Sequence, residues 1–385
     1  MKKTLILAGV LGTFAMSAHA QSSVTLYGSL DAGLAYVNNA GGHSLWAQGS
    51  GLLSNTYFGL KGAEDLGGGT KAIFKLESGF NLNNGSFSPG YFTGNSSGMF
   101  TRQAFVGLQN NQFGTLTLGR QFDSVADYLT PLALAGQAGG INVAAHPFNN
   151  DNIGAQFATS NAIKYESVNY AGFHFGGQYG FSNSTQFASG RQWSVGAGYE
   201  NGPFKVAAAY DQMNNVGTGA NATANSGAGL EGQSFAFGSA DVQRTVGVGA
   251  NYAYGPGTVG LLWTHSRLQG ISALTGNLNA RFDNIELNGT YALTPALALV
   301  GEYTYTWSRM TEDGNSTSPK WHSVTVGADY GLSKRTDVYL AGVYQHSSSV
   351  DSNGVSIPST SIGGILPSSS TQNQVAVTTG IRHRF

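Results

Sequence analysis

The feature that most constrains this chain is an alternation of side-chain character that returns about sixteen times along the sequence. Between Ala298 and Trp307, for example, Tyr303 and Tyr305 share one set of alternate positions, whereas polar residues such as Thr304 occupy the other. Successive side chains of a β-strand point to opposite faces, so each segment predicts a strand with one apolar and one polar face. Each segment holds about ten residues, the length that a tilted strand needs to cross the hydrocarbon layer of a membrane.

The connections between these segments alternate in length. Tight turns alternate along the chain with loops of about ten to forty residues; the turns lie at 64–69, 201–203, 255–257 and 294–295. One end of the expected sheet therefore carries short turns, and the other end carries long loops. The expected strands begin near Val24, Asn55, Thr70, Thr101, Thr115, Asn161, His174, Gln192, Phe204, Arg244, Thr258, Phe282, Ala296, Trp321, Thr336 and Gln374.

A closed barrel meets these constraints. Lipid offers no hydrogen-bond partner to an unpaired backbone amide, so a sheet that crosses a membrane must have no open edge. Short periplasmic turns, long external loops and an even number of strands are typical of outer-membrane barrels. The alternative is a large soluble sandwich or adhesin, whose outward face would be polar instead of aromatic. The sequence thus predicts an all-β fold, a 16-stranded antiparallel transmembrane β-barrel.

The first twenty residues are typical of a secretory signal peptide. They combine a charged start at Lys2 and Lys3, an apolar run over 5–16 and a small-residue exit before Gln21. We expect cleavage there and export from a bacterial-type cytoplasm, which leaves 21–385 as one barrel domain without a linker or a composition break. The chain has no cysteine, so disulfides do not stabilise it in an oxidising compartment.

Composition narrows the class further. Charged residues make up 10% of the chain, whereas soluble domains carry about a quarter. Glycine contributes 56 of the 385 residues, and tyrosine and phenylalanine contribute 18 and 21. Lysine and arginine number 19 against 20 acids, a balance that gives no electrostatic reason to bind nucleic acid. Outside the leader no apolar stretch of about 18 residues occurs, which excludes a helical membrane span.

Short stretches along essentially the whole mature chain resemble one family. They lie at 23–33, 58–67, 102–108, 118–121, 161–165 and 330–336, and at the terminus, which reads GIRHRF. The family is that of the trimeric general porins of Neisseria, Burkholderia and their relatives. The resemblance implies a homotrimer in outer-membrane lipids and passive diffusion of ions and small hydrophilic solutes. It also implies that the outer-membrane assembly machinery recognises the terminal strand, whose final Phe385 equally suits an aromatic girdle at a lipid interface.

The longest interior connection runs from about 122 to 160 and is unusually apolar for an external loop, particularly over 128–134. Such a loop is expected to pack against something, and the inner barrel wall is the nearest surface. The family resemblance implies the same arrangement, a third external loop folded into the pore. It also implies that the loop acids, here Asp123, Asp127 and Asp151, face basic wall residues, so that a transverse field sorts ions.

Alternation assigns several charged wall residues to the lumen. Lys164 and Glu166 lie opposite an apolar face, and so do Lys71, Lys75 and Glu77. A basic side chain held against lipid at the middle of the membrane would cost roughly 2–4 kcal/mol, so these residues are expected to face water. Each of them has two open interpretations, a solvated residue of a polar interior or a residue that affects conductance.

Two arginines and one tyrosine complete the expected pore constriction. Arg102 and Arg120 match pore arginines of the family by motif, although alternation places Arg120 on an apolar face. Tyr57 stands where many relatives have an arginine, which leaves the ion preference open. The expected constriction comprises Tyr57, Lys75, Arg102, Arg120, Asp123, Asp127, Lys164 and Glu166.

No catalytic, cofactor or metal site emerges from the sequence. A GxGxxG match at 227–232 lies in a glycine-rich loop, and the eight histidines lack metal-ligand spacing. No pairing of nucleophile and base is apparent. The family resemblance, together with the barrel pattern, implies a general diffusion porin of the outer membrane and no enzyme. A solute-specific channel, or an adhesin acting through the loops 215–241 and 347–372, is the alternative.

Overall fold

The structure is a computed structural model that describes residues 23–87, 98–137, 142–156, 158–216, 240–272, 277–348, 360–362 and 367–385. The predicted signal peptide lies outside these ranges, as does most of the two loops named for an adhesin. Across the described ranges, no helix has both the length and the apolar character needed to cross a membrane.

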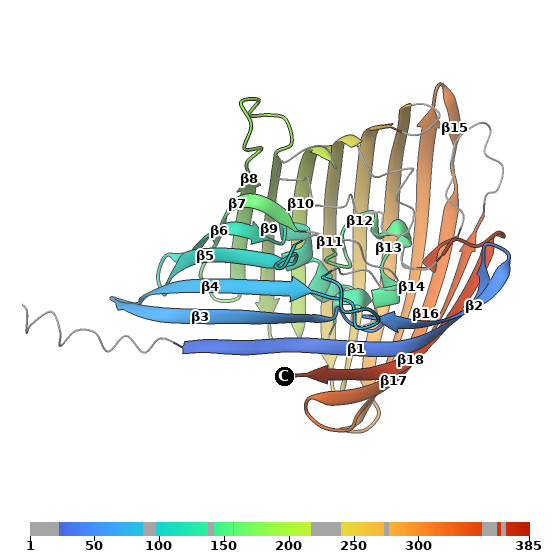
Figure 1. Cartoon of the computed structure of the whole chain (residues 1–385), viewed down its shortest axis with the longest axis horizontal. Helices are drawn as coiled ribbons and strands as arrows, with labels where there is room; N and C mark the ends of the chain where they lie inside the picture. The colour runs from blue at the N-terminus through green and yellow to red at the C-terminus, as the bar shows by residue number, and fades with distance from the viewer. Residues whose placement is uncertain are drawn as a thin grey trace, which may run out of the picture.

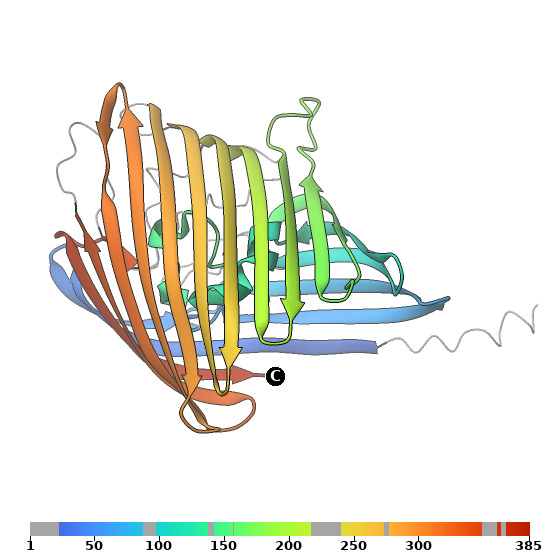
Figure 2. The same cartoon turned by 180° about the vertical axis from the view of Figure 1, so that it is seen from behind.

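Antiparallel strands close into a barrel (Figures 1 and 2), as the sequence predicts. Of the 18 strands within the described ranges, β2 (His43–Ser50) and β15 (Asn315–Thr317) form hairpins with β1 and β14, and the other 16 make the wall. Neighbours in sequence pair around the wall, and β1 closes it by pairing with both β18 and β3. The wall strands are β1 (Ser23–Ala40), β3 (Tyr57–Gly67), β4 (Thr70–Gly79), β5 (Gln103–Asn110), β6 (Gly114–Gln121), β7 (Thr159–Glu166), β8 (Phe173–Gly180), β9 (Gln192–Asn201), β10 (Phe204–Val216), β11 (Ala240–Tyr254), β12 (Gly257–Ser272), β13 (Asn277–Ala292), β14 (Leu297–Glu312), β16 (Lys320–Gly331), β17 (Thr336–Ser347) and β18 (Asn373–Arg384).

The predicted two-sided wall is present in these strands. On β14, Tyr303 is 42% exposed on the outer face, whereas Glu302 and Thr304 are buried on the inner face. The same holds at the chain end, where Ile381 is exposed and Arg382 is buried against acids of neighbouring strands. A soluble sandwich is thereby excluded, because its exposed face would be polar.

The barrel closes where the two chain ends meet. The backbone N–H of Gly28 donates to the carbonyl of Phe385 at 3.0 Å, and the N–H of Phe385 donates back to Gly28 at 3.1 Å. A Cβ atom at position 28 would lie only 2.6 Å from the Phe385 ring and from the Tyr57 carbonyl. Glycine is therefore required for the final aromatic residue to seat against the first strand.

The third external loop, which joins β6 to β7, lies inside the barrel. It contains α2 (Ser124–Tyr128) and the short 3-10 turns η1 (Thr130–Leu132), η2 (Leu134–Gly136), η3 (Asn142–Ala144) and η4 (Pro147–Asn149). Figure 2 shows these turns behind the tall strands of the wall. The apolar residues of the loop are buried in three clusters against inward-facing wall side chains, which explains why its sequence is apolar.

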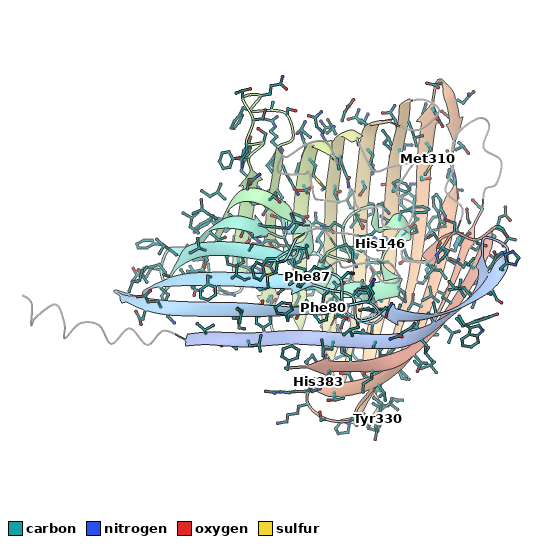
Figure 3. The ribbon with its side chains drawn as sticks, in the orientation of Figure 1. Phe80, Phe87, His146, Met310, Tyr330 and His383 are labelled. Atoms are coloured by element: carbon teal, nitrogen blue, oxygen red, sulfur yellow. The ribbon has the colours of Figure 1, made fainter. Side chains whose placement is uncertain are left out.

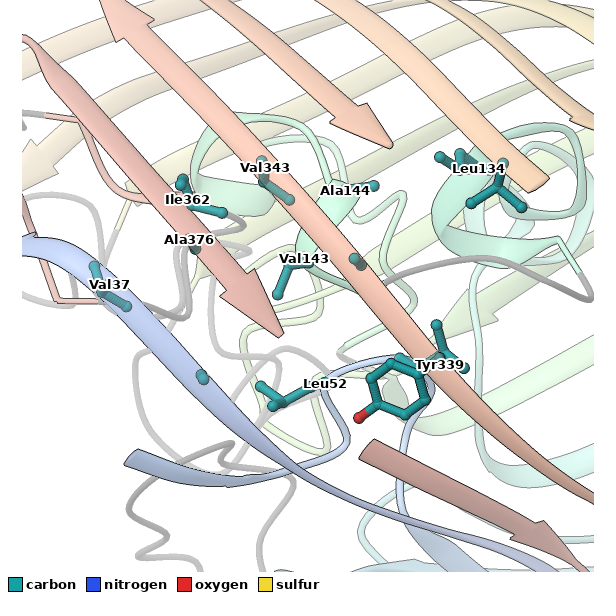
Figure 4. Packing of buried hydrophobic residues seen from close by; sticks show 13 residues of the cluster. Val37, Leu52, Leu134, Val143, Ala144, Tyr339, Val343, Ile362 and Ala376 are labelled. Carbon is teal, nitrogen blue, oxygen red and sulfur yellow. The ribbon is translucent and has the colours of Figure 1, made fainter. Parts of the chain in front are cut away.

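Each cluster fixes a different part of the loop. Leu129 packs with Leu262 of β12, and Phe148 packs edge-on against Trp321 of β16 with ring centroids 5.4 Å apart. Figure 4 shows the third cluster, in which Val143 of the loop lies among residues of β1, β17 and β18 such as Val343. The loop is thus held against wall strands on widely separated parts of the ring.

Candidate functional site

Asp123 sets the start of α2 and the shape of the loop. Its Oδ1 atom accepts a hydrogen bond from the backbone N–H of Ala126 at 2.8 Å, as an N-cap residue does. Its Oδ2 atom accepts one from Asn152 Nδ2 at 2.8 Å, which ties the first turn of the loop to its far end. Asp123 is buried, so it shapes the loop and does not face open water.

Lys164 of β7 is enclosed by the acids beside α2. Its Nζ atom forms an ion pair with Asp127, lies 3.7 Å from Glu166 Oε1 and donates to the carbonyl of Phe122 at 3.2 Å. The Lys164 side chain is 11% exposed, whereas those of Asp127 and Glu166 are 30% and 34% exposed. Water in the channel therefore meets two carboxylates, with the ammonium group behind them.

Tyr128 clamps α2 to the wall beside this ion pair. Its hydroxyl donates to Glu166 Oε2 at 2.7 Å, and its ring stacks on His174 of β8 with centroids 5.5 Å apart. The hydroxyls of Ser124 and Ser194 lie 2.9 Å apart one turn earlier. These contacts hold the acidic side of the site in one position against β7, β8 and β9.

A second charged group lies on the inner face of β1, β3 and β4. Glu77 receives hydrogen bonds from Arg102 Nε at 2.7 Å and from the Tyr27 hydroxyl at 2.8 Å. Lys75 Nζ lies 3.2 Å from the same carboxylate. Lys61, directly opposite Lys75 in the β3–β4 register, stands over the Tyr27 ring at 5.1 Å. Two cations thus contact one acid and a third stands over the neighbouring Tyr27 ring, so this side of the site is net positive.

Phe122 and Tyr57 connect the two groups. The guanidinium carbon of Arg102 lies 5.0 Å from the centroid of the Tyr57 ring and 5.2 Å from that of Phe122. Aromatic faces attract cations at this distance. Tyr57 therefore holds a cation of the wall and adds none.

Arg120 belongs to neither group. Its Nε atom donates to the carbonyl of Thr101 at 2.6 Å, and Nη1 donates to Ser160 Oγ at 2.7 Å. The β6–β7 register shifts between Gly119 and Gln121, so the strand is irregular at this point. The structure therefore brings together seven of the eight expected residues, with Asp123 as a buried support, and leaves Arg120 at the strand end.

A third polar group anchors the far part of the loop to the opposite wall (Figure 3, His146). His146 Nδ1 lies 2.6 Å from Asp151 Oδ2, and Nε2 lies 3.0 Å from Glu286 Oε2 of β13. The other Glu286 oxygen accepts the backbone N–H of Leu134 at 2.7 Å, and the Thr264 hydroxyl donates to Asp151 at 2.5 Å. His146, Asp151 and Glu286 are fully or almost fully buried.

Burial opposes a charge on the His146 ring, but the carboxylates of Asp151 and Glu286 outweigh it, and the pKa of His146 lies well above its usual value. Burial likewise raises the pKa of Asp151, yet the imidazolium and the hydrogen bonds around it bring that pKa below its usual value. An imidazolium donating from both ring nitrogens fits the two short contacts.

The sequence did not reveal this third group or the role of Lys61. Lys61 shares the parity of Tyr57 and Gly59 on its strand, so alternation could have assigned it to the lumen. His146 and Glu286 are 140 positions apart, and no local pattern connects them.

Comparison with known proteins gives consistent matches. The profile of the family described as Gram-negative porin matches residues 7–350. An outer membrane porin protein of Bordetella pertussis is 29% identical over 434 aligned positions and covers 100% of both chains. Outer membrane porin protein 32 of Delftia acidovorans is 31% identical over 397 positions with the same full coverage.

Among solved structures, an anion-selective porin from Comamonas acidovorans superimposes with a TM-score of 0.70. The match covers 94% of this chain and 100% of that one at 24% sequence identity. At this identity the likeness establishes the fold of the chain and nothing about its ion preference.

Proposed function

Because this chain belongs to the Gram-negative porin family and forms a channel through the outer membrane, we propose that ions and small hydrophilic solutes pass a constriction between α2 and the inner face of β1, β3 and β4. The observation that carries this proposal is the separation of charge across the site. Lys61, Lys75 and Arg102 stand on one side, and Asp127 and Glu166 stand on the other. Charges arranged in this way produce a transverse field that orders water and offers each sign of ion its own path.

The charges of the two sides nearly cancel, so we propose weak ion selectivity. Glu77 neutralises one of the three cations, and Lys164 neutralises one of two acids, Asp127 of α2 and Glu166 of β7. What remains is a modest positive excess around Lys61, Lys75 and Arg102 and one uncompensated carboxylate at the side of α2 and β7. A dense ladder of one charge or of aromatic side chains, which a solute-specific pore would use, is not seen among the described lumen residues.

We further propose a homotrimer that meets along β5 to β8. Each of these four strands has 8 residues. At a tilt near 40° such a strand rises about 20 Å, less than the roughly 25 Å apolar band of an outer-membrane barrel. Its outer face carries exposed apolar residues, Val106, Leu108, Leu116 and Leu118. A neighbouring copy would cover this low, apolar side of the wall.

The terminal strand has the features expected of a signal for the assembly machinery, and we propose that role for it. Phe385 ends the chain on the outer face, and its backbone pairs with Gly28 only once the barrel has closed. In the unfolded chain the same residue would be free for recognition.

Single-channel recording in planar bilayers tests the channel proposal. We expect ohmic conductance in groups of three steps, with a reversal potential near zero in a KCl gradient. Lys61→Gln combined with Lys75→Gln should shift the reversal potential toward cation permeability. Lys334→Gln is the matched control, because Lys334 is exposed in the turn between β16 and β17. Equal reversal potentials for both variants would contradict the proposed constriction, and single steps would contradict the trimer.

A further inference from the structure

Four arginines stand side by side on neighbouring strands of the tall wall. Arg244 of β11 is the register partner of Arg267 of β12, which faces Arg281 of β13, which in turn faces Arg309 of β14. Strands lie about 4.8 Å apart, so this arginine row spans about 14 Å around the barrel. Register partners project to the same face, so all four side chains share one surface.

That surface is the outside of the barrel. Arg267, Arg281 and Arg309 are exposed, and the flanking Ser266 and Leu268 are buried in the interior. Alternation otherwise places lipid-facing apolar residues at these positions, as with Leu261 on the same strand. An exposed arginine at the middle of the bilayer would cost roughly 2–4 kcal/mol, so the row must lie outside the hydrocarbon layer.

Aromatic residues fix the depth of the row. On β12 the outer face reads Trp263, His265 and Arg267 at successive alternate positions, and on β14 Trp307 precedes Arg309 in the same way. Tryptophan and tyrosine gather at the membrane–water interface. At about 3.3 Å per residue, the arginine positions lie some 7 to 13 Å farther along the strands than these tryptophans, toward the long-loop end. This is the level of the lipid head groups of the outer leaflet.

The arginine row has no acidic partner in the part of the chain that the structure describes. Within the described residues, none of the four guanidinium groups has an aspartate or glutamate oxygen within 4.0 Å. Arg244 donates only to neutral oxygens in the described contacts, those of Gln212 at 3.1 Å and Gln269 at 2.7 Å. Asp283, the acid two positions along β13 from Arg281, is bound to His265 Nδ1 at 2.8 Å. Like charges on directly opposed positions destabilise a sheet, so a bound anion would reduce the repulsion between the four guanidinium groups.

A shallow groove accompanies the row. His265, Arg267, Asn279, Arg281, Arg309 and Thr311 line a hollow of about 430 Å³ on this part of the wall. The combination of guanidinium forks with amide and hydroxyl groups matches the donors that recognise phosphate oxygens and sugar hydroxyls.

We propose that the arginine row binds the phosphorylated head group of a glycolipid of the outer leaflet, with phosphate groups bridging neighbouring arginines. The occupant follows from position and charge. The row stands directly above the aromatic band, where a head group is always present, and its width accommodates a head group with two phosphates. It lies on β11 to β14, away from the low wall of β5 to β8 proposed for contacts between copies. The proposal is independent of the pore constriction.

Diphosphoryl lipid A added to the purified detergent-solubilised protein is the probe, with bound lipid measured by native mass spectrometry. A triple variant that combines Arg267→Gln, Arg281→Gln and Arg309→Gln should bind this lipid at least tenfold more weakly, because several charge-assisted hydrogen bonds are lost. The matched control is Lys334→Gln with Arg335→Gln, two cations in the β16–β17 turn at the opposite end of the barrel. Unchanged single-channel conductance establishes that the triple variant is folded.

Two further measurements distinguish binding of a lipid head group from binding of free phosphate. Dephosphorylated lipid A should bind as weakly to the native protein as diphosphoryl lipid A does to the triple variant. Inorganic phosphate at the same concentration should not displace the lipid. Equal lipid binding by native protein and triple variant would overturn the proposal, and so would displacement by inorganic phosphate alone. Loss of the oligomer in the triple variant with lipid binding intact would overturn it as well, because the row would then be a contact between copies.

Discussion

The ring of Phe122 lies 5.2 Å from the guanidinium carbon of Arg102, while the carbonyl of the same residue accepts a hydrogen bond from Lys164. One residue at the start of the third loop therefore touches the cation of the β4 side and the cation of the β7 side. A change at either cation is transmitted to the loop, because both contacts position the residue that leads into α2.

Lys164→Gln should detach α2 from β7 and make the pore more cation-permeable. The substitution leaves Asp127 and Glu166 without the cation that they share, so α2 loses its ion pair with β7 and this side of the site becomes more negative. We expect a larger, noisier conductance and a reversal potential shifted toward cations in single-channel recordings. Lys334→Gln, in the exposed turn between β16 and β17, provides the control. An unaltered reversal potential in Lys164→Gln would show that Lys164 has no part in ion selection.

Tyr57→Arg should increase anion preference. The new guanidinium would replace the ring that now holds Arg102 and would add a fourth cation beside Lys61, Lys75 and Arg102. Tyr57→Phe keeps the ring face and should behave as the native protein, because the contact with Arg102 is to the ring. The check is the ratio of anion to cation permeability in a KCl gradient; a ratio changed equally by both substitutions would contradict the ring's role.

Docking of the far part of the third loop should weaken at alkaline pH. The pKa of His146 is raised by Asp151 and Glu286, so its contribution to stability is complete below the unfolded value near 6.5 and is lost as pH rises through the higher folded value. The pKa of Asp151 is lowered, so its contribution to stability is present above the unfolded value and is lost at acid pH, as pH falls below about 4. Hydrogen exchange of residues 142–156 between pH 6 and 10 measures the loss of protection expected at alkaline pH.

His146→Gln is the matched variant for this experiment. A glutamine keeps one hydrogen bond to the surrounding oxygens but has no proton to lose, so its exchange should show no extra loss of protection across the alkaline range after correction for intrinsic exchange. If the native protein and His146→Gln gave parallel profiles, the titrating group would have to be another one.

Gly28→Ala should destabilise barrel closure. A Cβ atom there would stand 2.6 Å from both the Phe385 ring and the Tyr57 carbonyl, and overpacking of this kind costs about 1–3 kcal/mol. Gly342→Ala on β17 is the control, because the added Cβ would meet nothing within 4 Å. The measurement is the temperature at which the folded species disappears on gels run in SDS without prior boiling. Equal melting of both variants would mean that the chain end closes the barrel loosely.

Period-two alternation is a local property, and it determined the barrel. Every expected strand corresponds to an observed one, with starts that agree within a few residues, such as Thr70, Gln192 and Phe204 for β4, β9 and β10. The two hairpin strands β2 and β15 were missed, because they lie outside the repeating membrane-length segments. Alternation also placed Lys75, Glu77 and Lys164 in the interior, since the inner and outer faces differ in solvent.

Tertiary structure decided which of those residues meet. The contact of Phe122 with both cations, the enclosure of His146 by Glu286, and the alignment of Arg244 with Arg309 across four strands depend on strand register and on the path of the third loop. A slip of one residue would move each side chain to the opposite face. Register is set by pairing between segments far apart along the chain, so sequence alone supplies the faces of the wall, and only the closed barrel supplies the neighbours.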